Sequence, residues 1–210
     1  MNTAIVWGGS GGIGRAVVDG LSAAGWRVLA VARDSVALEQ AGVAATSANF
    51  TSEHDVAAAT LWAAQQTDRV DMWVYAAGDM LGKPLADTSA AELGSMIGAN
   101  LTGAHLALTH SLPLVPPGGT LAFVGAYVDT IKLPKLGAYA ASKAALDAYV
   151  TVLGKELRDR NVINLRLGAV DTPLWRKAPF RLPKGARQPS DVASALLDAY
   201  SAGSKGNVDL

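Results

Sequence analysis

The chain has 210 residues, of which 50% are hydrophobic, and its 18 basic residues balance its 18 acidic ones. This size and a mean hydropathy of +0.22 predict a single domain over residues 1–210 with a large buried core, and the charge balance argues against binding to nucleic acid or a membrane surface. Cysteine is absent, which excludes disulfides, iron–sulfur clusters and thiol catalysis. No apolar run could span a bilayer, so we expect a cytoplasmic protein.

The first apolar run, Ala4–Trp7, leads into a glycine-rich stretch and then into an amphipathic pattern. Glycine tolerates positive φ and close approach by another group, so we expect a tight turn between a strand and a helix. The free N–H groups and positive dipole end of that helix would face the turn, where a phosphate fits. The glycines of the turn are Gly8, Gly9, Gly11, Gly12 and Gly14.

Two other glycine-rich motifs compete with this interpretation. A P-loop needs Gly-Lys-Ser/Thr, whereas Arg15 follows Gly14. Gly8–Gly12 also matches the nucleophile elbow of hydrolases around Ser10, but the preceding residues are too few to supply the strand and loop that carry half of an oxyanion hole. A purely structural tight turn stays open as the alternative to a phosphate-binding turn.

Apolar runs with the length of buried strands alternate with helical patterns along the chain. The expected strands are Ala4–Trp7, Val28–Ala32, Val43–Ala48, Met72–Ala77, Gly119–Gly125, Val162–Leu167 and Asn207–Leu210. The first expected helix follows the glycine-rich stretch and ends near Gly25, and the second is capped by Ser52 and ends near Gln66. The next two are Thr88–Leu112 and Ala138–Arg160, and Ser190 is expected to cap the last helix. The alternation predicts an α/β fold, a doubly wound parallel sheet of about seven strands with helices on both faces.

The second expected strand ends in Ala32, Arg33 and Asp34. A dinucleotide site that takes NAD places a carboxylate at this position, whereas one that takes NADP needs a cation for the 2′-phosphate. Arg33 therefore favours NADP, and Asp34 keeps NAD as an alternative. A solvated charge pair at the end of a strand is the structural interpretation.

Two helices carry polar residues that could serve chemistry. Asn100 interrupts the apolar stripe of the helix that begins with the capping box Ser89–Glu92, and a buried amide is costly unless it bonds to backbone or is placed for catalysis. Tyr139 and Lys143 are four residues apart and share one helix face. An ammonium group beside a phenol favours phenolate and lowers its pKa from about 10, although this spacing is common by chance.

Taken together, these motifs resemble the short-chain dehydrogenase/reductase family along almost the whole chain. The segments that match are the glycine turn, Ala76–Gly78, Asn100, Tyr139–Lys143 and Asp171–Pro173. The resemblance implies a Rossmann-type fold, Tyr139 as general acid/base, Lys143 lowering its pKa and binding the nicotinamide ribose, and Asn100 holding a proton-relay water. The resemblance also implies that Gly8, Ser10, Ile13 and Gly14 line the pyrophosphate, that Asn49 and Phe50 lie near the adenine, and that Thr172 contacts the nicotinamide amide. The other residues expected to bind the cofactor are Gly12, Arg33, Ala77, Gly78, Tyr139 and Lys143.

The chain departs from the family where a catalytic serine usually lies, because that position is Ala126. A missing oxyanion donor typically costs about a hundredfold to a thousandfold in rate. The dihydropteridine reductase branch also lacks the serine, and it resembles this chain at Trp7–Gly9, Gly125–Ala126 and Asp171–Lys177. That branch favours NADH and an acidic strand tip, however, which Arg33 contradicts.

The segment 174–189 is short and basic, so we expect a substrate lid that receives an anionic small molecule or covers cofactor phosphates, with a solvated flap as the alternative. Three functions stay open: an NADPH-dependent reductase of a carbonyl or activated C=N group, a dihydropteridine-reductase-like quinonoid reductase, and a weakly active NADP-binding regulator or scaffold. The three histidines lack a ligand spacing, so no metal is expected. A homodimer or homotetramer is expected through helices 88–112 and 138–160, whose outward small residues would include Gly103 and Ala107.

Overall fold

The computed structural model describes residues 1–210, and its centre is one sheet of seven parallel strands. The strands are β1 (Thr3–Trp7), β2 (Arg27–Ala32), β3 (Ala44–Ser47), β4 (Met72–Tyr75), β5 (Thr120–Val124), β6 (Asn161–Arg166) and β7 (Gly206–Asp209). Their order is β3-β2-β1-β4-β5-β6-β7, so the chain first winds outward from β1 in one direction and then in the other. The expected doubly wound, Rossmann-type sheet is confirmed, and its switch point lies between β1 and β4.

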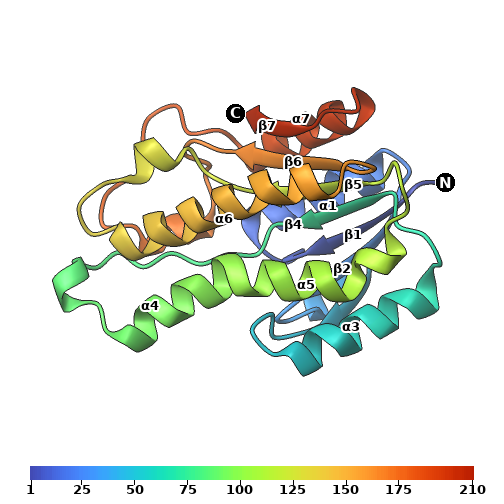
Figure 1. The fold of residues 1–210 in the computed structure, drawn as a ribbon, viewed down its shortest axis with the longest axis horizontal. Helices are drawn as coiled ribbons and strands as arrows, with labels where there is room; N and C mark the ends of the chain where they lie inside the picture. The colour runs from blue at the N-terminus through green and yellow to red at the C-terminus, as the bar shows by residue number, and fades with distance from the viewer.

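Helices cover both faces of the sheet (Figure 1). The helices are α1 (Gly12–Ala23), α2 (Val36–Gln40), α3 (Glu53–Gln66), α4 (Ala90–Ile97), α5 (Gly103–Ser111), α6 (Gly137–Glu156) and α7 (Pro189–Ser201). One core cluster joins the sheet to α3, α5 and α6, and a second of nearly equal size joins it to α1, α2 and α7. Within β1, Ile5 and Trp7 enter the first cluster while Ala4 and Val6 enter the second, which explains why the strand sequences are apolar throughout.

Several helix boundaries differ from those expected. The predicted helix 88–112 is α4, a π-helical stretch at Gly98–Thr102, and α5. The predicted helix 138–160 ends at Glu156, because residues 157–160 turn the chain into β6. Short α2 was not expected. Ser190 does not cap α7, since Gln188 and Asp191 form the capping box and Ser190 lies in the first turn.

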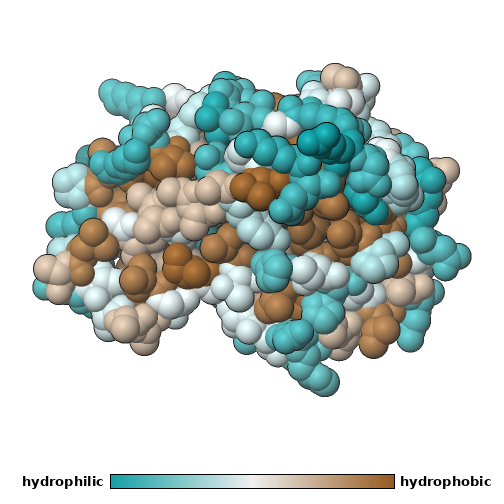
Figure 2. Space-filling view, viewed as in Figure 1, coloured by the Kyte–Doolittle hydropathy of each residue, from teal (hydrophilic) through white to brown (hydrophobic).

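The face formed by α4, α5 and α6 carries apolar side chains at its surface, and brown patches lie among the teal ones there in Figure 2. Leu93 on α4 and Val152 on α6 are exposed. Two of the small residues expected to face outward, Gly103 and Ala107, are instead buried, because α5 packs them toward Phe50 and the sheet. Assembly through these helices stays a prediction that would use Leu93 and Val152 rather than Gly103 or Ala107.

Candidate active site

The turn between β1 and α1 is closed by glycines that no larger residue could replace. Gly8 has φ +91°, and a Cβ there would lie 2.5 Å from the backbone nitrogen of Ala77 at the end of β4. A Cβ on Gly14 would overlap the carbonyl oxygen of Gly8. These two positions let α1 start directly against the sheet, so the helix N-terminus points at the switch point.

The N-terminus of α1 is open to a ligand. Its N-cap residue is Gly11, no side chain caps the helix, and its first turn holds no acidic residue. By contrast, Ser52 caps α3 and Ser89 caps α4. Uncapped N–H groups at the positive end of a helix fit an anion, so the turn can accept a phosphate. Ser10, Gly12 and Ile13 line the adjoining cavity.

The two charged residues after β2 have different surroundings. Arg33 lines the same cavity and makes no hydrogen bond or ion pair. The Asp34 carboxylate turns toward α2, where Oδ1 accepts a hydrogen bond from the Val36 N–H at 3.1 Å. The cation is thus available to a ligand in the cavity, while the carboxylate is engaged with backbone.

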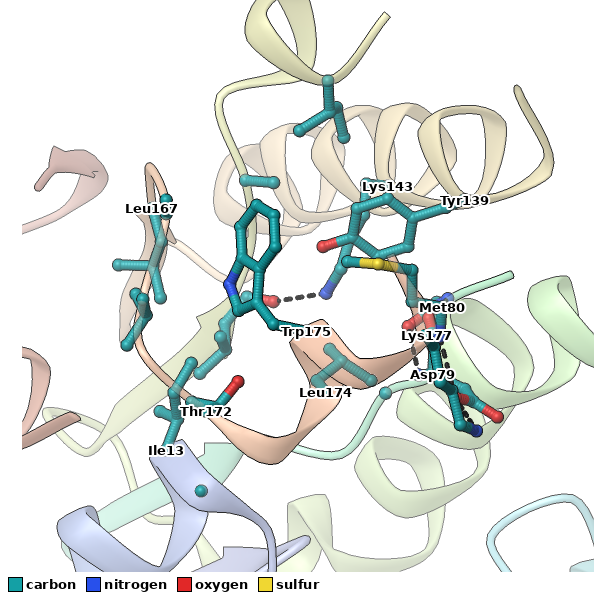
Figure 3. Close-up of a pocket in the computed structure, with 18 of the residues that line it drawn as sticks. Ile13, Asp79, Met80, Tyr139, Lys143, Leu167, Thr172, Leu174, Trp175 and Lys177 are labelled. Carbon is teal, nitrogen blue, oxygen red and sulfur yellow. Dashed lines mark hydrogen bonds and ion pairs between the residues drawn. The ribbon is translucent and has the colours of Figure 1, made fainter. Parts of the chain in front are cut away.

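One cavity of about 690 Å³ extends from the glycine turn to the N-terminal part of α6. It is lined by Gly12 and Arg33 and also by Tyr139 and Lys143. Figure 3 shows the Tyr139 and Lys143 side chains projecting from α6 toward Trp175. The Tyr139 hydroxyl has no hydrogen-bond partner, and it is therefore free to bond to a molecule bound in the cavity.

The protonation of this pair differs from the expectation. Burial raises the pKa of the Tyr139 phenol to about 12, whereas the pair was expected to lower it. Burial also lowers the pKa of Lys143 to about 8. The Lys143 ammonium donates to the carbonyl oxygen of Val124 at 2.9 Å and makes no hydrogen bond to the phenol. Tyr139 is therefore a protonated phenol near neutral pH, a state that can give a proton.

Asn100 lies in the π-helical stretch and is fully buried. Its side-chain oxygen accepts from the Asp79 N–H at 3.0 Å, and its amide nitrogen donates to the Asp79 carbonyl at 2.9 Å and to Ser142 Oγ at 2.9 Å. The side chain thus satisfies backbone after β4 and joins it to α6. Both amide hydrogens are donated, so a water held by this residue would have to donate to one of its oxygens, the side-chain Oδ1 or the backbone carbonyl.

The segment between β6 and α7, residues 167–188, covers the cavity. Thr172 packs on the glycine turn, because a Cβ at Gly12 would lie 2.8 Å from Thr172 Cγ2. Lys177 forms an ion pair with the Asp79 Oδ1 oxygen at 2.5 Å. Gly82 packs so closely on Lys177 and Pro179 that a Cβ there would lie 2.5 Å from the Lys177 carbonyl oxygen. Segment 167–188 therefore packs against the loops that follow β1 and β4.

Most of the basic residues of this segment do not face the cavity. Only Lys177 lines the cavity, and its charge is matched by Asp79. The five basic residues are Arg176, Lys177, Arg181, Lys184 and Arg187. Arg176 and Arg181 line a separate depression beside Asp171. The expectation of a cationic lid that receives an anionic substrate is therefore not supported by the side-chain positions.

Two expected cofactor residues lie elsewhere. Phe50 packs in the core at edge-to-face geometry against Trp7 and Tyr75, so its side chain cannot lie against an adenine ring in the cavity. The Asn49 side chain is exposed and accepts hydrogen bonds from Thr51. By contrast, Ala77 and Gly78 line the cavity as expected.

The sequence analysis missed several cavity residues, among them Asp79, Met80 and Trp175. Asp79 and Met80 directly follow Gly78, and ligands in such sheets bind at the carboxyl ends of strands, so their position was a usable signal. Trp175 belongs to the expected lid 174–189, but the sequence did not single it out, because its place in the cavity depends on how residues 167–188 fold back.

Comparisons with known proteins agree with this geometry. The model of a family described as short chain dehydrogenase matches residues 2–180. The chain belongs to the short-chain dehydrogenase/reductase family. Members of this family are oxidoreductases, and the residues that line the cavity lie in the part of the chain that the family model covers, apart from Pro183.

Individual relatives of this short-chain dehydrogenase/reductase span nearly its full length. 3beta-hydroxysteroid dehydrogenase 1 of Eggerthella lenta is 32% identical over 92% of this chain and 84% of its own. Carbonyl reductase family member 4 of Danio rerio is 28% identical over 92% of this chain and 89% of its own. An alcohol dehydrogenase of Thermococcus sibiricus, solved with 5-hydroxy-NADP, is 27% identical, with a TM-score of 0.89 over 100% of this chain and 96% of that one. None of the helices here is long and apolar enough to cross a membrane.

Proposed function

We propose that the protein is an NADPH-dependent reductase that transfers hydride to a carbonyl or activated C=N group, with Tyr139 as the proton donor. The observation that carries the proposal is that a single cavity joins the uncapped N-terminus of α1 to the unbonded hydroxyl of Tyr139. The similarity to an alcohol dehydrogenase solved with an NADP analogue supports the cofactor class.

The chain's own residues fit a nicotinamide dinucleotide. The turn at Gly8, Gly12 and Gly14 would hold the pyrophosphate, Arg33 the 2′-phosphate and Thr172 the nicotinamide amide. When bound, the reduced cofactor supplies a hydride, that is, a proton together with two electrons. Segment 167–188 would act as the lid that keeps water from this site.

Tyr139 and Lys143 then account for the remaining proton. The Tyr139 O–H bond breaks as its proton goes to the substrate oxygen or nitrogen, and Lys143, one turn along the same helix, would supply positive charge for the phenolate that remains. The raised pKa keeps Tyr139 protonated before reaction, which suits the reductive direction. Reprotonation from solvent returns the phenol.

The test is a panel of ketones, aldehydes and imines followed by the loss of NADPH absorbance, with NADH in parallel. Consumption of at least one carbonyl substrate, with NADPH preferred, supports the proposal. Tight binding of NADPH with no turnover on any substrate would contradict it and would favour the regulator or scaffold interpretation.

A quinonoid reductase is the second candidate, and Ala126 is the observation that favours it. Ala126 is buried and lines the cavity, and its side chain offers no hydrogen-bond donor for a carbonyl oxygen. An electron-poor quinonoid ring accepts hydride with less polarisation than a ketone. In Ala126→Ser, kcat/KM should rise for a ketone if ketones are the natural substrates, and should stay level or fall for a quinonoid dihydropterin.

A further inference from the structure

The cavity carries four charged residues, and their positions divide it into two regions. Arg33 follows β2, whereas Lys143 bonds to the end of β5. In the sheet order β2-β1-β4-β5 these ends are three strand spacings apart, about 14 Å. The remaining charges, Asp79 and Lys177, are paired with each other. The region around Tyr139 therefore holds no unpaired charge other than that of Lys143.

Around Tyr139 the walls are apolar. Met80, Leu136 and Tyr139 form one buried cluster, against which Ile131 and Leu174 pack. Leu133, Trp175 and Phe180 also line the cavity, and the rings of Trp175 and Phe180 lie 5.8 Å apart. Figure 3 shows Met80, Leu174 and Trp175 grouped beside Tyr139. A polar substrate body would lose its hydration here with few partners to replace it.

The ion pair between Asp79 and Lys177 explains why the basic segment 167–188 adds no unpaired charge to the cavity. The Asp79 carboxylate takes the Lys177 ammonium and also accepts from the Met80 N–H at 2.8 Å. The Asp79 backbone is held from the other side by Asn100. Asp79 is therefore fixed in place, and it cancels the single lid cation that could have bound an anion.

From these contacts we propose that the substrate is a neutral, apolar ketone, and that Asp79 sets this specificity by masking Lys177. The inference rests on the proposed reductase function and adds the substrate class. The chemistry is the reduction already described: hydride from NADPH to the carbonyl carbon, the Tyr139 proton to its oxygen, giving an alcohol and NADP⁺.

The test uses three acetophenones of similar size that carry a 4-methyl, a 4-carboxamide or a 4-carboxylate group. Their kcat/KM values with NADPH are divided by their borohydride reduction rates, which removes intrinsic reactivity. In the wild type, the methyl compound should exceed the carboxylate by about tenfold or more, because an unpaired charge is costly in an apolar site, with the amide between them. Equal or higher values for the carboxylate would overturn the proposal.

Variants then test the role of Asp79. Asp79→Asn keeps an acceptor for the Met80 N–H but leaves Lys177 uncompensated, so the preference for methyl over carboxylate should shrink by about tenfold. Adding Lys177→Met should restore the preference. Asp129→Asn is the matched control: it removes the same charge from an exposed pair with Lys132, neither of which lines the cavity, and should leave the preference unchanged. An unchanged preference in Asp79→Asn would refute the masking role.

Two further measurements separate the possible failures. If Asp79→Asn does not fold, Lys177→Met alone should increase the preference, since it leaves an unmatched carboxylate in the cavity. Calorimetric binding of the three compounds to the NADP⁺-saturated protein needs no turnover. The same order of affinities without any reduction would uphold the substrate class and reject the reductase function, whereas reduction with the reverse order would do the opposite.

Discussion

The glycine turn after β1 and the segment 167–188 border the same cavity, yet different forces hold them. The turn is determined by local backbone geometry, since Gly8 needs positive φ and Gly14 leaves no room for a Cβ. The segment 167–188 is held by contacts between residues far apart in the chain, such as Lys177 and Asp79, which are 98 positions apart. The end of the cavity at the glycine turn is therefore specified by local sequence, whereas the end under segment 167–188 depends on tertiary contacts.

The largest effect should follow from disrupting the glycine turn between β1 and α1. Gly14→Ala would place a methyl group on the Gly8 carbonyl oxygen, so the turn must move and cofactor binding should fall below detection. Gly94→Ala is the matched control on α4, where a Cβ meets nothing within 4 Å. It should raise the free energy of unfolding by roughly 0.4–1 kcal/mol. Normal cofactor affinity in Gly14→Ala, measured by fluorescence titration, would show that the turn is not what binds it.

The next effect concerns the proton donor at the boundary between the two regions. Tyr139→Phe removes only the hydroxyl, so kcat should fall by about 10²–10⁴. The dissociation constant for NADPH should change little, because the glycine turn and Arg33 are intact. Steady-state rates and a cofactor titration on the same preparation test both statements, and full activity in this variant would overturn the mechanism.

A smaller effect should test whether Arg33 contacts the 2′-phosphate of NADPH. Arg33→Ala should weaken NADPH binding by about 10- to 150-fold, the range of a hydrogen bond to a charged group, and should leave NADH binding nearly unchanged. Arg15→Ala is the matched control, since Arg15 pairs with Asp19 on α1 and does not line the cavity. Equal losses for both cofactors would rule out a 2′-phosphate contact.

The smallest effect is a pH dependence from Lys143. Its pKa is about 8 in the folded protein and 10.5 ordinarily, so the unfolded chain binds the extra proton between these values. Stability therefore rises with pH through this window. Between pH 7 and 9.5, wild type should gain about 2 kcal/mol in free energy of unfolding relative to Lys143→Met. Urea denaturation at both pH values measures the difference, and parallel changes in the two proteins would contradict it.

The fold was predictable because its signals are local and repeated. Each buried strand is a short apolar run, and Gly25, with φ +79°, follows the end of α1 as expected. The boundaries that failed depend on tertiary context. The π-helical stretch around Asn100 and the early end of α6 follow from bonds to Asp79 and from the turn into β6, neither of which leaves a periodic pattern.

The site divides in the same way. Tyr139, Lys143, Thr172 and the glycine turn were placed together from spacing and family resemblance, and they line or adjoin one cavity. The raised pKa of Tyr139 was not predictable, because the burial of its side chain causes it and burial depends on the tertiary fold. Phe50 was assigned to a ligand because sequence alone does not show that its ring packs between Trp7 and Tyr75.

The central claim is that hydride reaches a substrate beside Tyr139, and isotope transfer tests it most directly. NADPH carrying deuterium at both positions of nicotinamide C4 is mixed with excess enzyme and 4-methylacetophenone for a single turnover. The account predicts deuterium on the carbinol carbon of the alcohol in wild type and almost no alcohol in Tyr139→Phe over the same time. Alcohol without deuterium at that carbon, or equal yields from the two proteins, would contradict it.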